Sequence, residues 1–346
     1  MYFFKIIFQE KKKSRVYGNR KIENDSNSWK IDIEKERLFI KKYIIGLFII
    51  IPTLCPHCKT CSIGLREYNS INNPIIGKCN NYKCTRNIFL RNASLFQYNP
   101  KTPMSVIYNI IKLWLLEEKN CLKIKASLEE LYQIKNIDKR IIYNILINCR
   151  KVISTHLRNK YMLDRLAETN AHNLIAIDES LFTHKEGKQV WIVGLINLNT
   201  NEIRLEVVQD RSENTMKIII EKHVGKGNII NTDQWAAYNF LDREDSWYSH
   251  NTFNHNRGVF GATSRIESIW HEIKNIIKKI YISIRPDNFI YFLREAEFRR
   301  EIKNLNGNEK LKTFGDILSS ITMDGNINFI NEEELYKCDY ETYYDD

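Results

Sequence analysis

The sequence lacks a hydrophobic run long enough to cross a membrane. Its most apolar segment, "YIIGLFIIIPTL" from Tyr43 to Leu54, is twelve residues long, whereas a spanning helix needs about twenty. The opening "MYFFKIIF" has no basic region before its apolar residues and no small-residue cleavage site, so it does not resemble a secretory signal. We therefore expect an intracellular protein with reduced cysteines, and we interpret residues 43–54 as a core helix.

Acidic residues are too few to balance the basic ones, except in the last sixteen residues. The chain has 52 Lys and Arg against 42 Asp and Glu, for a net charge of +10. From Asn331 onward there are seven acids and one lysine, so the rest of the chain carries +16. A basic body favours a polyanionic partner, nucleic acid before membrane. The acidic tail is expected to be disordered.

Five of the eight cysteines lie between Cys55 and Cys84. Cys55 and Cys58 form "CPHC", and twenty residues later Cys79 and Cys84 form "CNNYKC". Paired thiolates two to four residues apart, joined by a loop of this length, are typical of a tetrahedral structural zinc site. Cys61 and His57 are further possible donors, and free thiols are the alternative to zinc.

The segment after the cysteines has the apolar spacing of helices. "PKTPMSVIYNIIKLWLLEE" predicts one helix, a second is expected around Ala126 to Tyr132, and a third from Asp138 onward. Two short helices joined by a polar turn resemble a helix-turn-helix, which would bind DNA. An ordinary helical hairpin is the alternative.

From Asn173 onward, the spacing of the apolar residues changes from that of helices to that of strands. "NLIAID", "QVWIVGLIN" and "EIRLEVVQD" predict three antiparallel strands. They are followed by a helix in "SENTMKIIIEKHV" with Ser212 as N-cap, a strand in "NIINTD", a helix in "QWAAYNFL", a strand in "WYSHNTF" and a helix in "TSRIESIWHEIKNIIKKIY". This order predicts an α/β protein with a ribonuclease-H-like domain, built on a mixed five-stranded sheet with helices.

Three acids lie at positions in this order of elements where a ribonuclease-H-like sheet would bring them together. Asp178 ends the first strand, Asp233 ends the fourth, and Glu267 lies on the last helix. The two strands are neighbours in a ribonuclease-H-like sheet, so the carboxylates would meet and would hold two Mg²⁺ or Mn²⁺ ions. The alternative is that each acid only caps an element. Glu179 adjoins Asp178 and would point to the opposite face of the strand.

The stretch from about Leu174 to Arg300 resembles the DDE transposases of the Merlin superfamily and the related bacterial insertion-sequence transposases. "IDES", "VWIVGLIN", "VVQDRSENTM", "NTDQWAAY", "FNHN" and "TSRIESIWHEIK" occur in the family's order and at similar spacing, with 33 residues between Asp233 and Glu267. The resemblance implies that Asp178, Asp233 and Glu267 are catalytic. A zinc ribbon and helix-turn-helix-like helices also precede the catalytic domain in this family.

The resemblance implies a DNA transposase that cleaves transposon ends and joins them to target DNA as a homo-oligomer. A DNA-binding protein without catalysis and a ribonuclease-H-like nuclease without strand transfer are the alternatives. A nucleus is the expected location in a eukaryote, and otherwise the cytoplasm or nucleoid. Candidate DNA contacts are His255, Lys274, Lys123, Lys125, Lys139, Arg140 and Arg150.

The chain is thus divided into five parts. We expect a disordered basic arm at residues 1–37, a zinc ribbon with a preceding helix at 38–100 and a helical DNA-binding region at 101–165. The ribonuclease-H-like domain is expected at 170–304, and a C-terminal extension with the acidic tail at 305–346.

Overall fold

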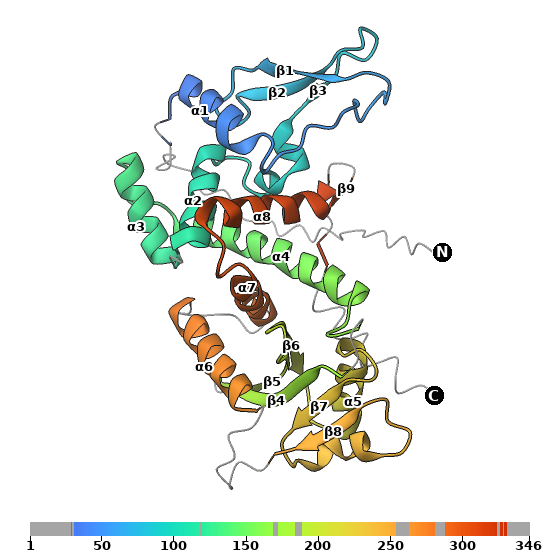
Figure 1. Ribbon diagram of the computed structural model, residues 1–346. Helices are drawn as coiled ribbons and strands as arrows, with labels where there is room; N and C mark the ends of the chain where they lie inside the picture. The colour runs from blue at the N-terminus through green and yellow to red at the C-terminus, as the bar shows by residue number, and fades with distance from the viewer. Residues whose placement is uncertain are drawn as a thin grey trace, which may run out of the picture.

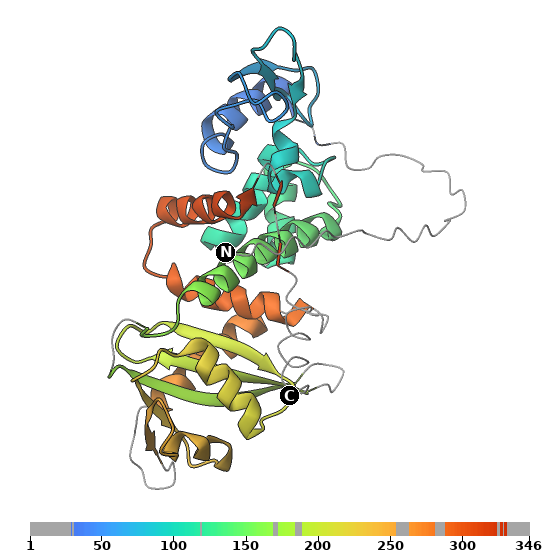
Figure 2. The ribbon, with the colours of Figure 1, turned by 90° about the vertical axis from the view of Figure 1, so that its right-hand side faces the viewer.

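The chain forms a small sheet, a group of helices and a large sheet, which follow one another along the molecule (Figures 1 and 2). The long helix α4 (Lys139–Leu163) runs from the helices toward the large sheet. The computed structural model describes Trp29 and residues 31–117, 120–168, 172–183, 189–253, 263–280, 288–323, 326–327 and 329–330. None of the helices in these ranges is long and apolar enough to cross a membrane.

The small sheet is antiparallel, with its strands in sequence order. It leads into the helices through two short 3-10 turns, where the guanidinium of Arg91 is buried and donates to the carbonyl oxygens of Asn72, Phe96 and Asn99 at 2.8–3.1 Å. Its elements are β1 (Ile63–Glu67), β2 (Ile75–Cys79), β3 (Asn87–Ile88), η2 (Leu90–Ala93) and η3 (Leu95–Tyr98).

The segment before the small sheet differs from the predicted core helix. Helix α1 (Ile33–Phe39) begins inside the predicted arm, because the Asp32 side chain accepts from the Lys35 amide. It continues as a π-helical turn, η1 (Ile40–Ile44), and ends there. Gly46 has a φ of +86°, a left-handed conformation that favours glycine and turns the chain. Residues 43–54 are buried in part, as their hydrophobicity predicted, but the predicted core helix is wrong, because only Tyr43 and Ile44 are helical, at the end of η1.

The central helices share one hydrophobic core. Helix α2 (Met104–Glu117) is buried along most of its length and packs with α3 (Cys121–Tyr132) and with the first half of α4. Asp138 caps α4 by accepting from the Arg140 amide at 2.9 Å. Helix α8 (Gly307–Ser320) lies in the same core through Phe314. The predicted helices are confirmed, and the C-terminal extension contributes a helix to them. The hairpin β9 (Thr322–Met323) and β10 (Asn326–Ile327) follows α8.

The large sheet has the order β6-β5-β4-β7-β8. β6, β5 and β4 are antiparallel, whereas β4, β7 and β8 are parallel. This mixed five-stranded arrangement is the ribonuclease-H-like fold class that the order of elements predicted. Its strands are β4 (Leu174–Thr183), β5 (Gln189–Asn197), β6 (Ile203–Val208), β7 (Ile229–Thr232) and β8 (Ser249–Thr252).

Helices cover both faces of the large sheet (Figures 1 and 2). On one face α6 (Thr263–Ile280) and α7 (Phe289–Glu301) pack on Ala176 and its neighbours. On the other face α5 (Glu213–His223) and the 3-10 helix η4 (Ala236–Asp242) pack on Ile175 and Ile177. Alternate residues of β4 therefore face different helices, and this alternation decides where each acid of the predicted site points.

Candidate active site

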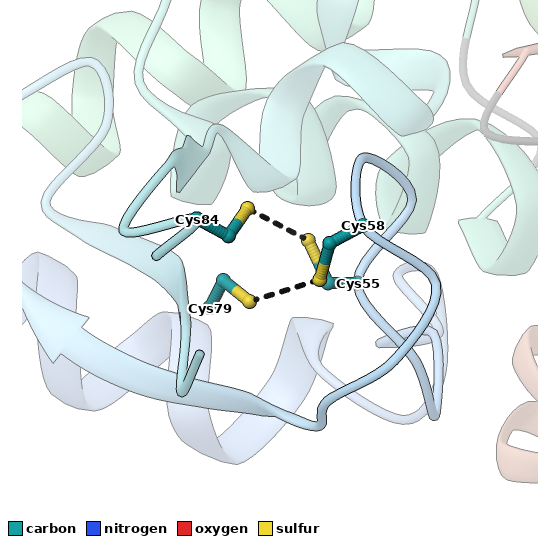
Figure 3. A group of neighbouring side chains, drawn as sticks. All are labelled: Cys55, Cys58, Cys79 and Cys84. Carbon is teal, nitrogen blue, oxygen red and sulfur yellow. Dashed lines mark hydrogen bonds between the residues drawn. The ribbon is translucent and has the colours of Figure 1, made fainter. Parts of the chain in front are cut away.

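Four cysteine sulfur atoms meet beside the small sheet (Figure 3). The Sγ atoms of Cys55 and Cys84 are 3.9 Å apart, those of Cys58 and Cys79 are 3.5 Å apart, and all four lie within 4.8 Å of one another. Tetrahedral coordination with bonds of about 2.3 Å places sulfur atoms about 3.8 Å apart. The four cysteines therefore form a group that could hold a zinc ion.

The two further donors that the spacing left open lie outside this group. The carbonyl of Cys61 accepts from the Cys55 amide at 2.8 Å, which helps to close the loop, but the Cys61 thiol is not among the four clustered sulfur atoms. Nδ1 of His57 lies 3.4 Å from the guanidinium of Arg86. Both residues shape the surroundings of the cysteine group.

The surroundings affect the four thiols unequally. The Thr60 hydroxyl donates to Cys58 Sγ at 3.2 Å, and this bond, together with the Thr60 amide, lowers the pKa of Cys58 to about 5. Burial raises the pKa of Cys79 to about 12. Zinc ligands must be thiolates. A divalent cation would therefore be needed to keep Cys79 deprotonated at neutral pH.

Asp178 and Asp233 lie at the same level on neighbouring strands. In the parallel pairing of β4 with β7, Leu174 lies opposite Ile229 and Ala176 opposite Asn231. Continuing this register by two residues places Asp178 beside Asp233, and neighbouring strands are about 4.8 Å apart. The prediction that these two strands lie side by side is confirmed.

Asp178 is held in place by a tryptophan from α6. Nε1 of Trp270 donates to Oδ2 of Asp178 at 2.9 Å. The indole lies over Gly194, the residue of β5 paired with Asp178, and a Cβ on Gly194 would be 2.6 Å from Trp270 Cζ2. The absence of a side chain at Gly194 thus lets α6 approach the sheet closely enough to make this bond. Trp270 lies three residues after Glu267 in the sequence, but no local pattern indicates its bond to Asp178.

Asp233 is fixed by its own turn. Its Oδ1 accepts from the Trp235 amide at 2.9 Å, and its carbonyl accepts from the Thr232 hydroxyl at 2.8 Å. That hydroxyl also lies 2.8 Å from Nε2 of His250, whose Nδ1 lies 2.9 Å from Oδ1 of Asp242. The end of β7 is therefore braced from β8 and η4.

Glu267 lies on α6, one turn before Trp270, and it is exposed. Burial raises the pKa of Asp178, and the negative charges of Asp233 and Glu267 raise it further. Like charges gathered in this way favour a bound cation, and carboxylate oxygens are donors that Mg²⁺ prefers. Within the described ranges only the four cysteines have all their donor atoms within 4.8 Å, so the three carboxylates are less tightly grouped.

Glu179 points away from this group, as the alternation of the strand predicted. It accepts a hydrogen bond from the Tyr238 hydroxyl on the α5 side of the sheet. Burial raises the pKa of Glu179 to about 7. No local pattern indicates this bond, because Tyr238 is 59 residues away from Glu179.

The candidate DNA contacts differ in their availability. Lys123 and Lys139 are exposed, Lys125 pairs with Glu129, and Arg140 is exposed and pairs with Asp138. The prediction for Arg150 is wrong, because its side chain is 4% exposed and its Nε lies 2.5 Å from the buried carboxylate of Glu295. Nζ of Lys274 lies 5.3 Å from the ring centroid of Phe182. His255 lies outside the described residues.

Replacing Gly194 with alanine should disturb the site through Trp270. The new methyl group would overlap the indole, and overpacking of this kind costs about 1–3 kcal/mol. We expect a lower free energy of unfolding than that of wild type, measured by chemical denaturation. The control is Gly307→Ala, where the nearest atom to a Cβ is Leu116 Cδ1 at 3.5 Å. If the two variants behave alike, Gly194 is not the space that Trp270 needs.

One comparison with known proteins finds a match over the segment that forms the large sheet and helices α5 to α7. Residues 171–301 match the family model described as ISXO2-like transposase domain, which supports a DDE transposase family for this segment. A search of curated proteins finds no match.

Among solved structures, the HTLV-2 integrase catalytic core domain in complex with magnesium is similar in a trimeric and in a dimeric form, each at 12% identity. These matches cover 47% and 39% of this chain and 91% and 88% of theirs, with TM-scores of 0.24 and 0.27. The strand order and strand directions of the large sheet define its ribonuclease-H-like fold class.

Proposed function

We propose that this protein is a DNA transposase of the DDE type, with Asp178, Asp233 and Glu267 as its catalytic carboxylates. The observation that carries the proposal is the register of β4 and β7, which brings Asp178 level with Asp233. Glu267 acts on the same group, since its charge raises the pKa of Asp178. The match of residues 171–301 to a transposase domain gives independent support.

The three carboxylates would hold two Mg²⁺ or Mn²⁺ ions. When bound, such ions activate an attacking oxygen and stabilise a leaving oxygen during displacement at phosphorus. Trp270 and the Trp235 amide fix the orientation of the two aspartates. Water would attack the phosphodiester at the transposon end and release a 3′-hydroxyl. That hydroxyl would then attack a phosphodiester of target DNA, a step taken from the resemblance to transposases.

The small sheet is proposed to be a zinc ribbon whose structural ion is held by Cys55, Cys58, Cys79 and Cys84. The ribbon and the helices α2 to α4 would bind the terminal repeats, with exposed Lys123 and Lys139 among the phosphate contacts. Phosphate contacts supply affinity and base contacts supply specificity. This arrangement is that of the Merlin superfamily, and joining two ends implies a homo-oligomer. In a eukaryotic cell the protein would act in the nucleus.

The test is cleavage of a labelled DNA duplex carrying the transposon end, with Mg²⁺ or Mn²⁺. Asp233→Asn should lower the cleavage rate by more than about a hundredfold, because it removes a charged ligand from the ion site. The matched control is Asp245→Asn, an exposed aspartate in the loop between η4 and β8, which should cut like wild type.

Other results would favour the alternatives. If wild type binds the duplex and never cuts it, the protein is a DNA-binding relative without catalysis. If it cuts but does not join the 3′-hydroxyl to a second duplex, it is a nuclease without strand transfer. Equal cleavage by wild type and Asp233→Asn would contradict the assigned site.

A further inference from the structure

A partly buried carboxylate lies behind the proposed catalytic pair and has no part in the mechanism above. Glu179 follows Asp178 on β4 and points to the opposite face of the sheet, where it accepts a hydrogen bond from the Tyr238 hydroxyl. Tyr238 belongs to η4, and its side chain is buried. Removing a carboxylate from water costs free energy unless it is hydrogen-bonded or paired. The contacts of Glu179 on this face therefore decide what it contributes.

The backbone pairing of β4 with β7 stops short of the two aspartates. Within the described ranges, the last paired residues are Ala176 and Asn231, each two residues before its aspartate. After Thr232 strand β7 ends, and the chain turns into η4. The bonds from β8 brace the other side of β7. The register thus brings Asp178 and Asp233 to the same level, but backbone pairing with β4 does not hold Asp233 there.

A chain of hydrogen bonds leads from Asp233 back to β4. The Asp233 carboxylate accepts from the Trp235 amide at 2.9 Å, and the Trp235 carbonyl accepts from the Tyr238 amide at 3.1 Å. The Tyr238 hydroxyl then donates to Glu179. We call Glu179, Trp235 and Tyr238 the back clamp. It connects the carboxylate of Asp233 with the residue next to Asp178.

Aromatic and charged contacts pack the back clamp against the sheet. The rings of Trp235 and Tyr238 meet edge to face, with their centroids 6.2 Å apart. Cζ of Arg211 lies 3.7 Å from the ring centroid of Trp191 on β5 and 4.4 Å from that of Trp235. The positive charge of Arg211 also interacts with Glu179. Both tryptophans pack on the core on the α5 side of the sheet, so the back clamp lies on that side.

We propose that Glu179 is a positioning residue, which holds the turn of Asp233 against β4 through Tyr238 and so sets the distance between the Asp178 and Asp233 carboxylates. This inference rests on the proposed function, since it assumes that the two aspartates bind metal ions. Two catalytic ions lie about 3.5–4 Å apart, and their ligands must be held within about 0.5 Å of the productive geometry. A charged acceptor forms a stronger hydrogen bond than a neutral one, which suits Glu179 to this role.

The test is a Mn²⁺ titration of the full-length protein, purified with zinc and without DNA, in which free Mn²⁺ is measured by electron paramagnetic resonance. Tyr238→Phe removes the hydroxyl and keeps both the ring and the charge of Glu179. It should bind Mn²⁺ roughly tenfold more weakly than wild type, the effect of losing one hydrogen bond to a charged group. Cleavage of the labelled duplex should need a correspondingly higher Mn²⁺ concentration, with little change in the rate at saturating Mn²⁺.

Two substitutions of Glu179 separate its hydrogen bond from its charge. Glu179→Gln and Glu179→Ala both remove the negative charge, but the amide oxygen of glutamine can still accept from Tyr238. Glu179→Gln should therefore bind Mn²⁺ more tightly than Glu179→Ala does. Equal affinities of the two variants would show that Glu179 acts through its charge alone, and the positioning role would be refuted.

Tyr248→Phe is the matched control. The Tyr248 hydroxyl donates to the Val224 carbonyl at 3.1 Å, and Tyr248 directly precedes β8, which is parallel to β7. It therefore lies at the edge of the sheet away from Asp233. The substitution removes the same group and should leave the Mn²⁺ affinity unchanged. Wild-type affinity in Tyr238→Phe, or an equal loss in Tyr248→Phe, would contradict the proposal.

The same titration separates the two proposals. If Asp233→Asn binds Mn²⁺ as wild type does, the proposed carboxylate site fails and the positioning role fails with it. If Asp233→Asn loses the ion while Tyr238→Phe matches wild type, only the positioning role fails. All variants are compared at a temperature below the melting temperature of each, so that unfolding does not contribute to any loss.

Discussion

Replacing Cys79 with serine is expected to release zinc and unfold the small sheet. Cys79 is the last residue of the central strand β2, and its sulfur lies 3.5 Å from that of Cys58. A structural zinc ion contributes about 10–16 kcal/mol of apparent binding free energy in small zinc modules. Few large apolar side chains are buried in the strands themselves, chiefly Ile75 and Ile76 of β2. The sheet would have little else to keep it folded.

The measurement is the zinc content of purified protein, together with amide hydrogen exchange over residues 55–88. Wild type should carry one equivalent of zinc and Cys79→Ser much less, with fast exchange in β1 and β2. Cys61→Ser is the control, because it is the same chemical change at a thiol outside the clustered group, and it should keep its zinc. Zinc loss in both variants, or in neither, would contradict the assignment of four ligands.

Replacing Glu206 with glutamine should destabilise the large sheet by about 3–5 kcal/mol, the cost of breaking a buried ion pair. Glu206 lies on the edge strand β6 and is buried. It accepts from Arg158 of α4 at 2.5 and 3.0 Å and from Arg294 of α7 at 3.2 Å. Nε2 of His223 on α5 lies 2.8 Å from it. Without its charge, two buried guanidiniums would lose a counter-ion.

The free energy of unfolding, measured with denaturant, tests this expectation. Glu213→Gln is the control, since Glu213 pairs with Arg243 at the surface, and exposed pairs contribute at most about 1 kcal/mol. A loss for Glu206→Gln no larger than for Glu213→Gln would show that the network does not hold α4 to the sheet.

The acid side of the stability curve gives a second measurement of the same network. Burial alone would raise the pKa of Glu206, but the guanidiniums of Arg158 and Arg294 hold this pKa well below its usual range. Stability from such a group is fully present above the unfolded pKa of about 4.3 and is lost as the pH falls through the lower folded value. Glu206→Gln should therefore lose less stability on acidification than wild type does.

Local patterns in the sequence determined most of the secondary structure around the large sheet. The alternation of apolar residues located β4 to β8. Ser212 caps α5, as predicted, and Asp138 caps α4, the helix predicted from this residue onward. These features depend on neighbours within a few residues, so they can be read from the chain. The cysteine spacing belongs with them, because a ligand pair needs only a short loop.

Long-range packing decided what local patterns could not. The segment 43–54 was apolar enough for a helix, yet Gly46 turns the chain there. Arg150 looked like an exposed cation on a helix, but α7 covers it and supplies Glu295 as its counter-ion. Burial of a charged residue depends on which element packs over it, and that element can be more than a hundred residues away.

In the candidate site, too, some features follow from local sequence and others from long-range packing. The sequence by itself predicted the three carboxylates, from the order of elements and from the family's motifs. The prediction that Asp178 ends its strand is wrong, because β4 continues to Thr183. Only the tertiary structure decided how they are held. Trp270 reaches Asp178 across the bare backbone of Gly194, although Trp270 and Asp178 are 92 residues apart in the sequence. Such contacts exist only after the sheet has brought distant segments together, because no local rule fixes the distance between them.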